Sequence, residues 1–517
     1  EKKSSPVQAL PDAGFGTLPP YEIEGKSLIR IYLVVEKDLV AERLNALVAH
    51  VTSGRELLPE EPLSLLKEGR FVVKMREEAW SGDPSRDDAE EGELIRSFFE
   101  ELVSRLKEEV ELWDTFAALG GSTEEKGAPL HFYVWSQADI KNLVEAILRV
   151  GPKGGSLLEA FWHLMGCREG LEQLIFSSLS DEVRTRYAVG YTSHSLITVT
   201  SLPWFGKSFP WKDINLKDLF KHWLFDFRHY ENGRFMEVRS RNYDTLPPVY
   251  WRFFWGKEPS GELSPKVKQV LGEASRHIPA YLRARALALR WLEEHIKPKN
   301  KQLQKPLMLP EELPDFRLEA RDVLRVARDF LRFEQQVRLS LWLADKTLPP
   351  GLRVRNGTSL LLENLQTSSE CSEGAEEGDC YVATISSYPP GTSLRDLEAQ
   401  FTLGPGDFVR VATAENSEKP QNLKDILFSG FTAILKELDW TRGKVKLAPV
   451  FSRNRDHYVL QSQQPQEGWT LATMDPSPSD YVGLRVDAVL TSLLNGEKVA
   501  KELGRWFDPQ HPQIPPV

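Results

Sequence analysis

The first part of the chain alternates short apolar runs with amphipathic stretches. Residues 27–37 (SLIRIYLVVEK), 71–75 (FVVKM) and 130–135 (LHFYVW) are rich in β-branched and aromatic residues, which is typical of buried strands. Residues 88–113 repeat apolar side chains at every fourth position, and 136–149 begin at a serine that can cap a helix. Alternating strands and helices predict an α/β layer.

The pattern then becomes mainly helical. We expect helix to continue through 156–177, a returning strand at 195–200, and a long basic helix over 264–296. A proline-punctuated linker at 298–318 leads into an amphipathic helix at 319–345.

Residues 358–474 alternate short β-rich runs with turns, and a last helix is expected at 479–494. Short strands at regular spacing predict a small barrel. The expected strands are SLLLENL, CYVATIS, DFVRVAT, KVKLAPVF, HYVLQS and WTLATM.

The predicted fold class is therefore α/β plus all-β. The expected division is a linker at 1–26, an α/β domain at 27–202, an aromatic and basic, mainly helical section at 203–297, a linker at 298–318, a stalk helix at 319–357, a small β-barrel at 358–474, and a helix with a C-terminal linker at 475–517. Because both ends read as linkers, we expect an internal slice of a longer protein.

Composition narrows the function classes. With 517 residues, 41% of them apolar, the chain can bury sizeable cores, which excludes global disorder. A net charge of −10 argues against a protein that coats DNA with a uniformly basic surface. Three cysteines without CxxC spacing exclude a cysteine-rich zinc site, and no apolar run is long enough for a membrane helix. We expect a cytoplasmic protein without a membrane partner.

Acidic residues at strand ends are the first candidate chemistry. Glu36 and Asp38 end the strand at 27–37, and Asp139 follows the strand at 130–135. Nucleases that use Mg²⁺ need carboxylates converging at strand ends, so these three are candidate catalytic residues, with Glu36 and Asp38 as metal ligands. The alternative is that they cap helices or solubilise the surface. No P-loop, HExxH or GxSxG motif occurs.

The second candidate for chemistry is an aromatic and arginine-rich region at 203–262. Arginines bind phosphates and aromatic rings stack on unpaired bases, whereas the alternative is that the rings form a core with arginine stems packed on them. The candidates for phosphate contacts are Arg239, Arg241, Arg252, Arg283, Arg285, Arg353, Arg453 and Arg455, and those for stacking are Tyr250 and Trp251.

Six stretches together resemble the region that precedes the motor in large bacterial superfamily 1 helicases fused to RecB-type nuclease or RNase H-like domains. The stretches are IYLVVEKDLVAERLNALVAHVT (31–52), PLHFYVWSQADIKNLVEAILR (129–149), RSRNYDTLPPVYWRFFWG (239–256), ARDFLRFEQQVRLSLWLADKTLPPGLRVRNG (327–357), LGPGDFVRVAT (403–413) and MDPSPSDYVGLRVDAVLTSL (474–493).

The resemblance implies an RNase H-like α/β domain, a stalk and an accessory barrel that together guide single-stranded or forked DNA to an ATP-driven motor outside these residues. Val34 stands where nucleases of this fold carry an aspartate, which implies a degenerate site that positions DNA without cutting it. Two alternatives stay open: an active Mg²⁺-dependent nuclease, and a non-catalytic scaffold subunit of an anti-phage defence or DNA-processing complex.

Overall fold

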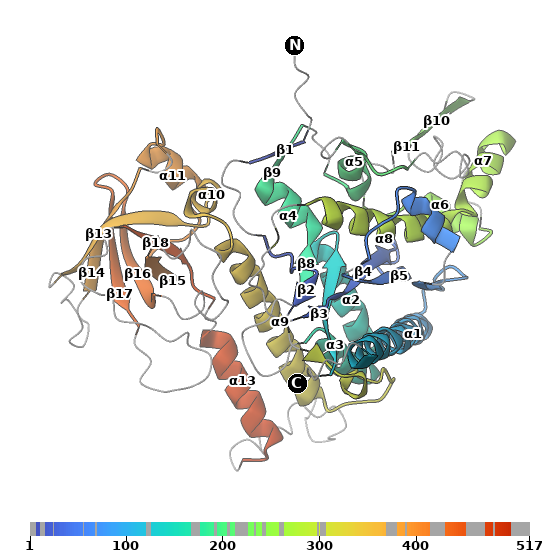
Figure 1. Cartoon of the computed structure of the whole chain (residues 1–517), viewed down its shortest axis with the longest axis horizontal. Coiled ribbons are helices and arrows are strands. Elements are labelled where there is room, and N and C mark those ends of the chain that lie inside the picture. The colour runs from blue at the N-terminus through green and yellow to red at the C-terminus, as the bar shows by residue number, and fades with distance from the viewer. Residues whose placement is uncertain are drawn as a thin grey trace, which may run out of the picture.

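The computed structural model describes most of the chain. The described residues are 7–10, 16–23, 25–54, 56–67, 70–119, 126–166, 176–190, 194–203, 207–211, 226–231, 234–239, 244–257, 263–296, 299, 305, 307–368, 380–387, 390–413, 430–450, 471–478 and 481–497. They form a mixed α/β part and a closed six-stranded barrel, joined by a long helix (Figure 1).

A six-stranded sheet is the centre of the α/β part. Its strands run in the order β6-β5-β4-β7-β8, and β12 also pairs with β7. β4 to β6 form an antiparallel meander, whereas β7 is parallel to both β4 and β8. The strands are β4 (Ile29–Lys37), β5 (Leu44–Ser53), β6 (Phe71–Met75), β7 (Ala128–Val134), β8 (Phe176–Ser178) and β12 (Leu307–Met308).

β4 is the central strand, as its apolar sequence predicts, because β5 and β7 flank it. The strands expected at 71–75 and 130–135 are confirmed as β6 and β7. β5 was not predicted, since Asn45 and His50 interrupt its apolar pattern. Both side chains are buried in the sheet, where Asn45 accepts a hydrogen bond from Trp80 and His50 is hydrogen-bonded to Arg290.

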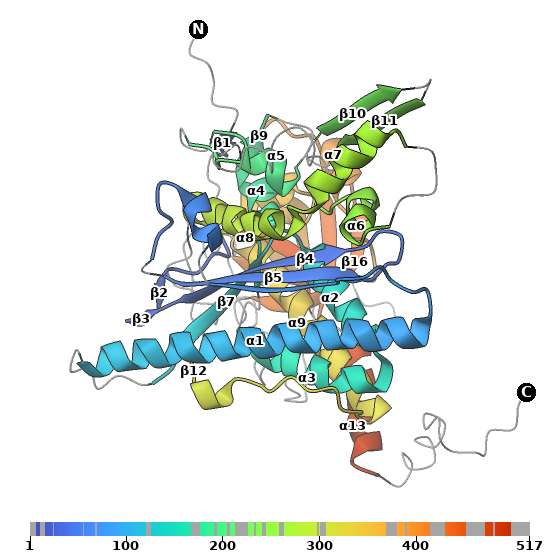
Figure 2. The same ribbon diagram turned by 90° about the vertical axis from the view of Figure 1, so that its right-hand side faces the viewer.

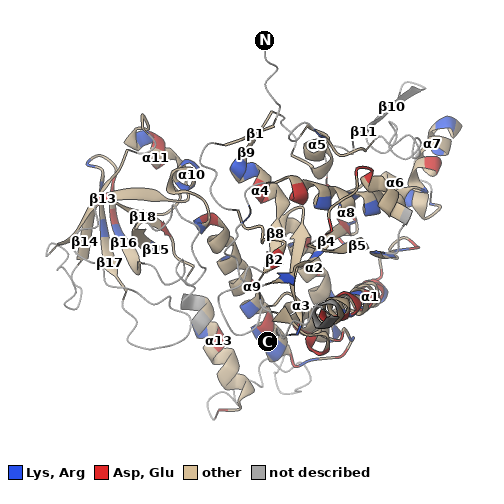
Figure 3. Ribbon diagram, in the orientation of Figure 1, with Lys and Arg blue, Asp and Glu red and all other residues tan. Residues whose placement is uncertain are grey.

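Helices cover both faces of the sheet. α1 (Pro84–Leu119), α2 (Gln137–Arg149) and α3 (Gly154–Leu164) cover one face, and α8 (Ile278–His295) covers the other (Figure 2). The fourfold repeat Leu94, Phe98, Leu102 and Leu106 is buried against the sheet, which confirms the predicted amphipathic helix. Acidic and basic residues intermix along α1 (Figure 3), where Arg96 pairs with Glu93 and Glu100.

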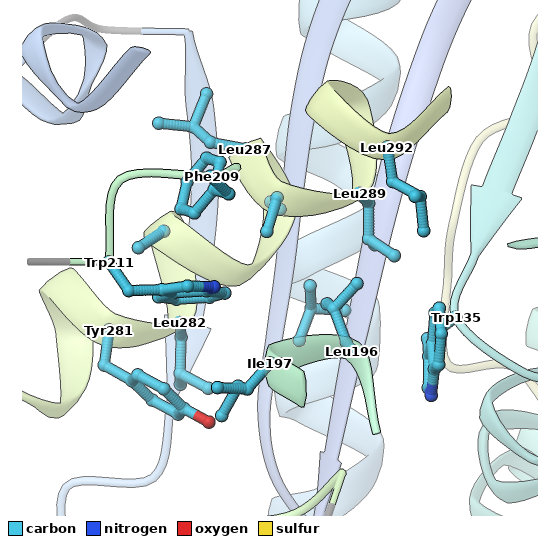
Figure 4. Packing of buried hydrophobic residues seen from close by; sticks show 14 of the residues in the cluster. Trp135, Leu196, Ile197, Phe209, Trp211, Tyr281, Leu282, Leu287, Leu289 and Leu292 are labelled. Carbon is cyan, nitrogen blue, oxygen red and sulfur yellow. The ribbon is translucent and has the colours of Figure 1, made fainter. Parts of the chain in front are cut away.

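The aromatic section shares a core with the sheet. Trp135 after β7 lies in the same cluster as Phe209, Trp211 and several leucines of α8 (Figure 4). Polar contacts add to this packing: the buried Glu293 of α8 accepts from Arg30 and from Tyr32 of β4, each at 3.0 Å. Residues 263–296 therefore belong to the α/β core rather than to a separate body.

Three expected elements differ from the structure. Residues Leu196–Thr200 form a helix, α5, because Ser195 caps its first turn by accepting from the Thr198 amide. The region expected to stay helical to 177 ends in strand β8. The single helix expected at 264–296 is two, α7 (Pro265–Ser275) and α8, since Pro279 starts a new helix after the break at His277.

Smaller elements complete this part. They are the pairs β1 (Val7–Ala9) with β9 (Tyr187–Val189), β2 (Glu22–Ile23) with β3 (Lys26–Ser27) and β10 (Asp226–Glu231) with β11 (Arg234–Arg239), the helices α4 (Leu179–Arg186) and α6 (Pro248–Phe254), and the 3-10 turns η1 (Pro62–Lys67), η2 (Gly151–Lys153) and η5 (Pro310–Glu312).

The predicted barrel is confirmed as a closed antiparallel one in the order β13-β14-β17-β16-β15-β18. Its elements are β13 (Leu360–Ser368), β14 (Cys380–Ile385), α11 (Leu394–Gln400), β15 (Phe408–Thr413), β16 (Phe431–Asp439), β17 (Lys444–Pro449) and β18 (Leu471–Pro476). β16 was not predicted, and the expected strand HYVLQS lies outside the described residues. Cys380 of β14 is disulfide-bonded.

A long helix carries the barrel. α9 (Val323–Lys346) packs on α3 and on α13 (Tyr481–Leu494), and α10 (Pro350–Arg355) leads into β13. Both the helix expected at 319–345 and that at 479–494 are thus confirmed. Within the described residues, no helix combines the length and hydropathy that crossing a bilayer requires.

Candidate functional site

The carboxylate of Glu36 lies at the end of the central strand and is fully buried. One of its oxygens accepts from the Leu246 amide at 2.5 Å, and the other forms an ion pair with Arg285 of α8 at 2.6 Å. The Arg285 side chain is only 3% exposed. A buried charge needs such a partner, because the protein interior does not solvate it.

Asp139 belongs to the same cluster. It is the third residue of α2, where it accepts from the Ser136 amide at 2.8 Å and completes a capping box. Asp244, before α6, accepts from the Leu196 amide at 3.0 Å. Three carboxylates from distant parts of the sequence, those of Glu36, Asp139 and Asp244, therefore share the field of the Arg285 guanidinium.

Burial raises the pKa values of two carboxylic acids in this cluster. It raises the pKa of Asp139 to about 7, although the Ser136 amide and Arg285 oppose the rise. Burial also raises the pKa of Glu36, and the Arg285 guanidinium limits that rise. The Arg285 pKa is itself raised, since nearby Tyr281 and the carboxylates outweigh the effect of burial.

Asp38 does not join the cluster. It directly follows Lys37, the last residue of β4, and lies in the loop that leads to β5. One Asp38 oxygen accepts from the Val40 and Ala41 amides at 2.7 and 2.9 Å and holds the loop between β4 and β5. Asp38 thus holds a turn between two strands.

The cluster is a poor set of ligands for Mg²⁺. Both Glu36 oxygens already have partners, and a guanidinium lies where a cation would be held. Among the described residues, no group of three or more His, Cys, Asp or Glu side chains could hold a metal ion. A divalent cation would also be repelled by the Arg285 charge.

Four residues expected to contact nucleic acid are instead buried. Tyr250 and Trp251 are both 0% exposed and belong to the core, so neither ring can stack on a base. Arg285 is held by Glu36, and Arg353 is held by Asp475. The sequence pattern could not separate these side chains from surface ones, because arginine and aromatic residues serve equally in cores and in binding surfaces.

Arg252 of α6 and Arg283 of α8 remain partly exposed. Arg239 ends β11, whose side chains the structure does not describe. Arg241, Arg453 and Arg455 lie outside the described residues.

Sequence reasoning missed Asp244 and the pairing role of Arg285. The charged positions of α8 gave one usable signal, because Arg285 lies in an otherwise apolar helix face that has to be buried.

Compared with known proteins, the chain matches no family model, no curated protein and no solved structure.

Proposed function

We propose that this chain is a nucleic-acid-binding accessory module whose α/β part is a non-cutting RNase H-like domain. The observation that carries the proposal is the Arg285–Glu36 ion pair at the end of the central strand. In a two-metal nuclease this position holds Mg²⁺ between carboxylates and the scissile phosphate. A fixed guanidinium balances the carboxylate charge without offering a metal-bound nucleophile.

The topology supports the RNase H-like part of the proposal. If β4, β5, β6, β7 and β8 are numbered 1 to 5 in chain order, they lie across the sheet in the order 3-2-1-4-5. Strands 1 to 3 form an antiparallel meander, strands 4 and 5 are parallel to strand 1, and helices lie between strands 4 and 5 in the sequence. The candidate acid Glu36 lies at the end of the first strand and Asp139 follows the fourth, and these two strands lie side by side. Parallel neighbours end at the same edge of a sheet, so their following residues converge.

The stalk and barrel support the accessory role. The closed barrel lies on the other side of α9 from the sheet (Figure 1), and α10 joins it to that helix. By its resemblance to helicase accessory regions, this arrangement would guide a single or forked DNA strand to an ATP-driven motor outside these residues. ATP would bind that motor, not the described residues.

The experiment measures binding of a labelled single strand by fluorescence anisotropy over about 50 to 200 mM salt. We expect binding that weakens linearly in the logarithm of salt concentration, because each neutralised phosphate releases counterions. The absence of binding at the lowest salt would overturn the proposed function.

A cleavage assay tests the active-nuclease alternative. Incubating the strand with the protein and Mg²⁺ should leave the strand intact, since the carboxylate cluster offers no metal site. Mg²⁺-dependent cleavage that Glu36→Gln abolishes would contradict the non-cutting role and favour the nuclease. Cleavage that survives Glu36→Gln would come from another source, and the role of the cluster would stand.

A further inference from the structure

A pocket of about 600 Å³ opens where β4 ends. The loop from Asp38 to Arg43 forms one wall, and Trp80 with the start of α1 forms a second. The end of α6 closes it with Arg252, Trp255 and Lys257.

The acids of the pocket are already satisfied. Asp38 accepts from the loop amides, as described above. Asp87 of α1 accepts from the amides of Ser81 and Gly82, each at 2.9 Å, and from the Ser81 hydroxyl. Those bonds lower the pKa of Asp87 although burial opposes them. Both carboxylates therefore act as turn and cap groups and offer few free oxygens to the cavity.

The cations of the pocket divide into two kinds. Arg43 is paired with Asp88 at 2.6 Å and with Glu91 at 3.0 Å. The half-buried Arg252 and the exposed Lys257 have neither an ion pair nor a side-chain hydrogen bond within the described part of the chain. The pocket thus carries two positive charges that form no ion pair with the described residues.

The indole walls are fixed in place. Trp80 donates to the Asn45 side chain at 3.0 Å, and the Arg76 guanidinium lies 4.3 Å from its ring centre. Trp255 donates to the Arg76 carbonyl at 3.0 Å. Hydrogen-bonded indole walls, beside two cations without an ion pair among the described residues, suit a ligand that joins an anionic group to a flat, less polar one, as a nucleotide does.

We propose that this pocket holds a backbone phosphate of a nucleic acid strand, with Arg252 and Lys257 as its ligands and the indoles of Trp80 and Trp255 against the attached nucleoside. The inference rests on the proposed function and gives it a location. The strand would pass beside Glu36, at the sheet edge where a nuclease would cut and this cluster does not.

The test compares Arg252→Gln, Lys257→Gln and the double variant with the wild type. A fluorescein-labelled oligothymidylate is titrated over a salt series. Each single variant should weaken binding roughly three- to tenfold and reduce the slope of log affinity against log salt by about 1, because one phosphate contact is lost. The Tm of each variant should match that of the wild type, since neither side chain has a partner in the described part of the chain.

Arg184→Gln is the matched control. Arg184 is an exposed arginine on α4 outside the pocket, with a side chain 66% exposed, and its loss changes the net charge equally. Its binding and salt slope should equal those of the wild type. An equal loss in the control, or unchanged binding by both pocket variants, would overturn the pocket while leaving the proposed function intact.

Two further outcomes are informative. If the wild type binds no strand at all, the proposed function and the pocket inference fall together. If a nucleoside monophosphate or inorganic phosphate displaces the strand at equal molar concentration, the site is one for a free anion, and the strand assignment is overturned.

Discussion

Arg285 supplies the positive charge in a cluster of three carboxylates, those of Glu36, Asp139 and Asp244. Its guanidinium is part of the fold, whereas a metal ion would be exchangeable. Removal of one partner from a buried pair leaves an uncompensated charge, which costs more than the pair itself contributes.

Arg285→Met should therefore lower the free energy of unfolding by about 3 to 5 kcal/mol, because Glu36 stays buried without its partner. Urea unfolding at neutral pH measures the change. The double variant Glu36→Gln, Arg285→Met should recover part of the loss, since the amide of glutamine carries no charge and can still accept from Leu246. Equal losses in the single and double variants would show that the two side chains do not act as a pair.

The raised pKa of Asp139 predicts that the stability of the fold depends on pH. Its pKa of about 7 in the folded state lies above the value of about 3.9 in an unfolded chain, so the folded state binds the proton more tightly. The contribution of Asp139 is fully present below the unfolded value and is lost as pH rises through about 7.

Relative to Asp139→Asn, the wild type should lose stability between about pH 4 and 7, by about 1.4 kcal/mol for each unit that separates the two pKa values. Above that window the difference should stay constant. Urea unfolding of both proteins at pH 5 and pH 8 measures it, because asparagine keeps the acceptor for the Ser136 amide. Parallel stability curves would contradict the raised pKa.

At the scale of elements, one buried aspartate joins the barrel to its stalk. Asp475 of β18 pairs with Lys346 of α9 and with Arg353 of α10, and it accepts from Ser359. Burial would raise the pKa of Asp475, but the two cations hold it at about 2. The Trp342 indole of α9 adds a hydrogen bond of 2.7 Å to the Pro476 carbonyl. The orientation of the barrel on α9 depends on this junction.

Asp475→Asn should loosen the junction by about 3 to 5 kcal/mol, since Lys346 and Arg353 would remain buried without their counterion. Hydrogen exchange should become faster in β18 and α10 and stay unchanged in β4 and β5. The control is Glu437→Gln on β16, whose exposed pair with Lys446 is worth less than about 1 kcal/mol. Uniform acceleration across the whole chain would instead indicate global destabilisation.

At the scale of the whole molecule, the described residues form three hydrophobic cores. One lies on each face of the sheet and the third fills the barrel. The sheet is thus buried on both sides, and this packing stabilises it.

Magnesium should not stabilise this molecule. A ligand that binds only the folded state raises Tm, so a resident Mg²⁺ would produce a shift between millimolar Mg²⁺ and EDTA. We expect equal Tm values by calorimetry in the two conditions. A rise with Mg²⁺ that is lost in Glu36→Gln would place a metal in the carboxylate cluster and refute the role given to Arg285.

Sequence patterns were informative where one period dominated. The fourfold repeat in α1 and the apolar run of β4 predicted both the elements and their buried faces. The same reasoning failed for Leu196–Thr200, since a β-rich pentapeptide became helical once Ser195 capped it. It also failed for Trp251, because aromatic content does not reveal which side of a helix faces the core.

The sequence alone determined several of the strands and helices, the presence of a barrel and the candidacy of Glu36 and Asp139, because local periodicity and residue type carry that information. Only the tertiary structure decided that Arg285, far along the chain, pairs with Glu36, and that Asp38 holds the loop after β4. It likewise left Arg252 and Lys257 beside an open pocket. Such outcomes depend on contacts between distant segments. Burial then decides whether a charged side chain pairs within the fold or stays exposed to bind a ligand.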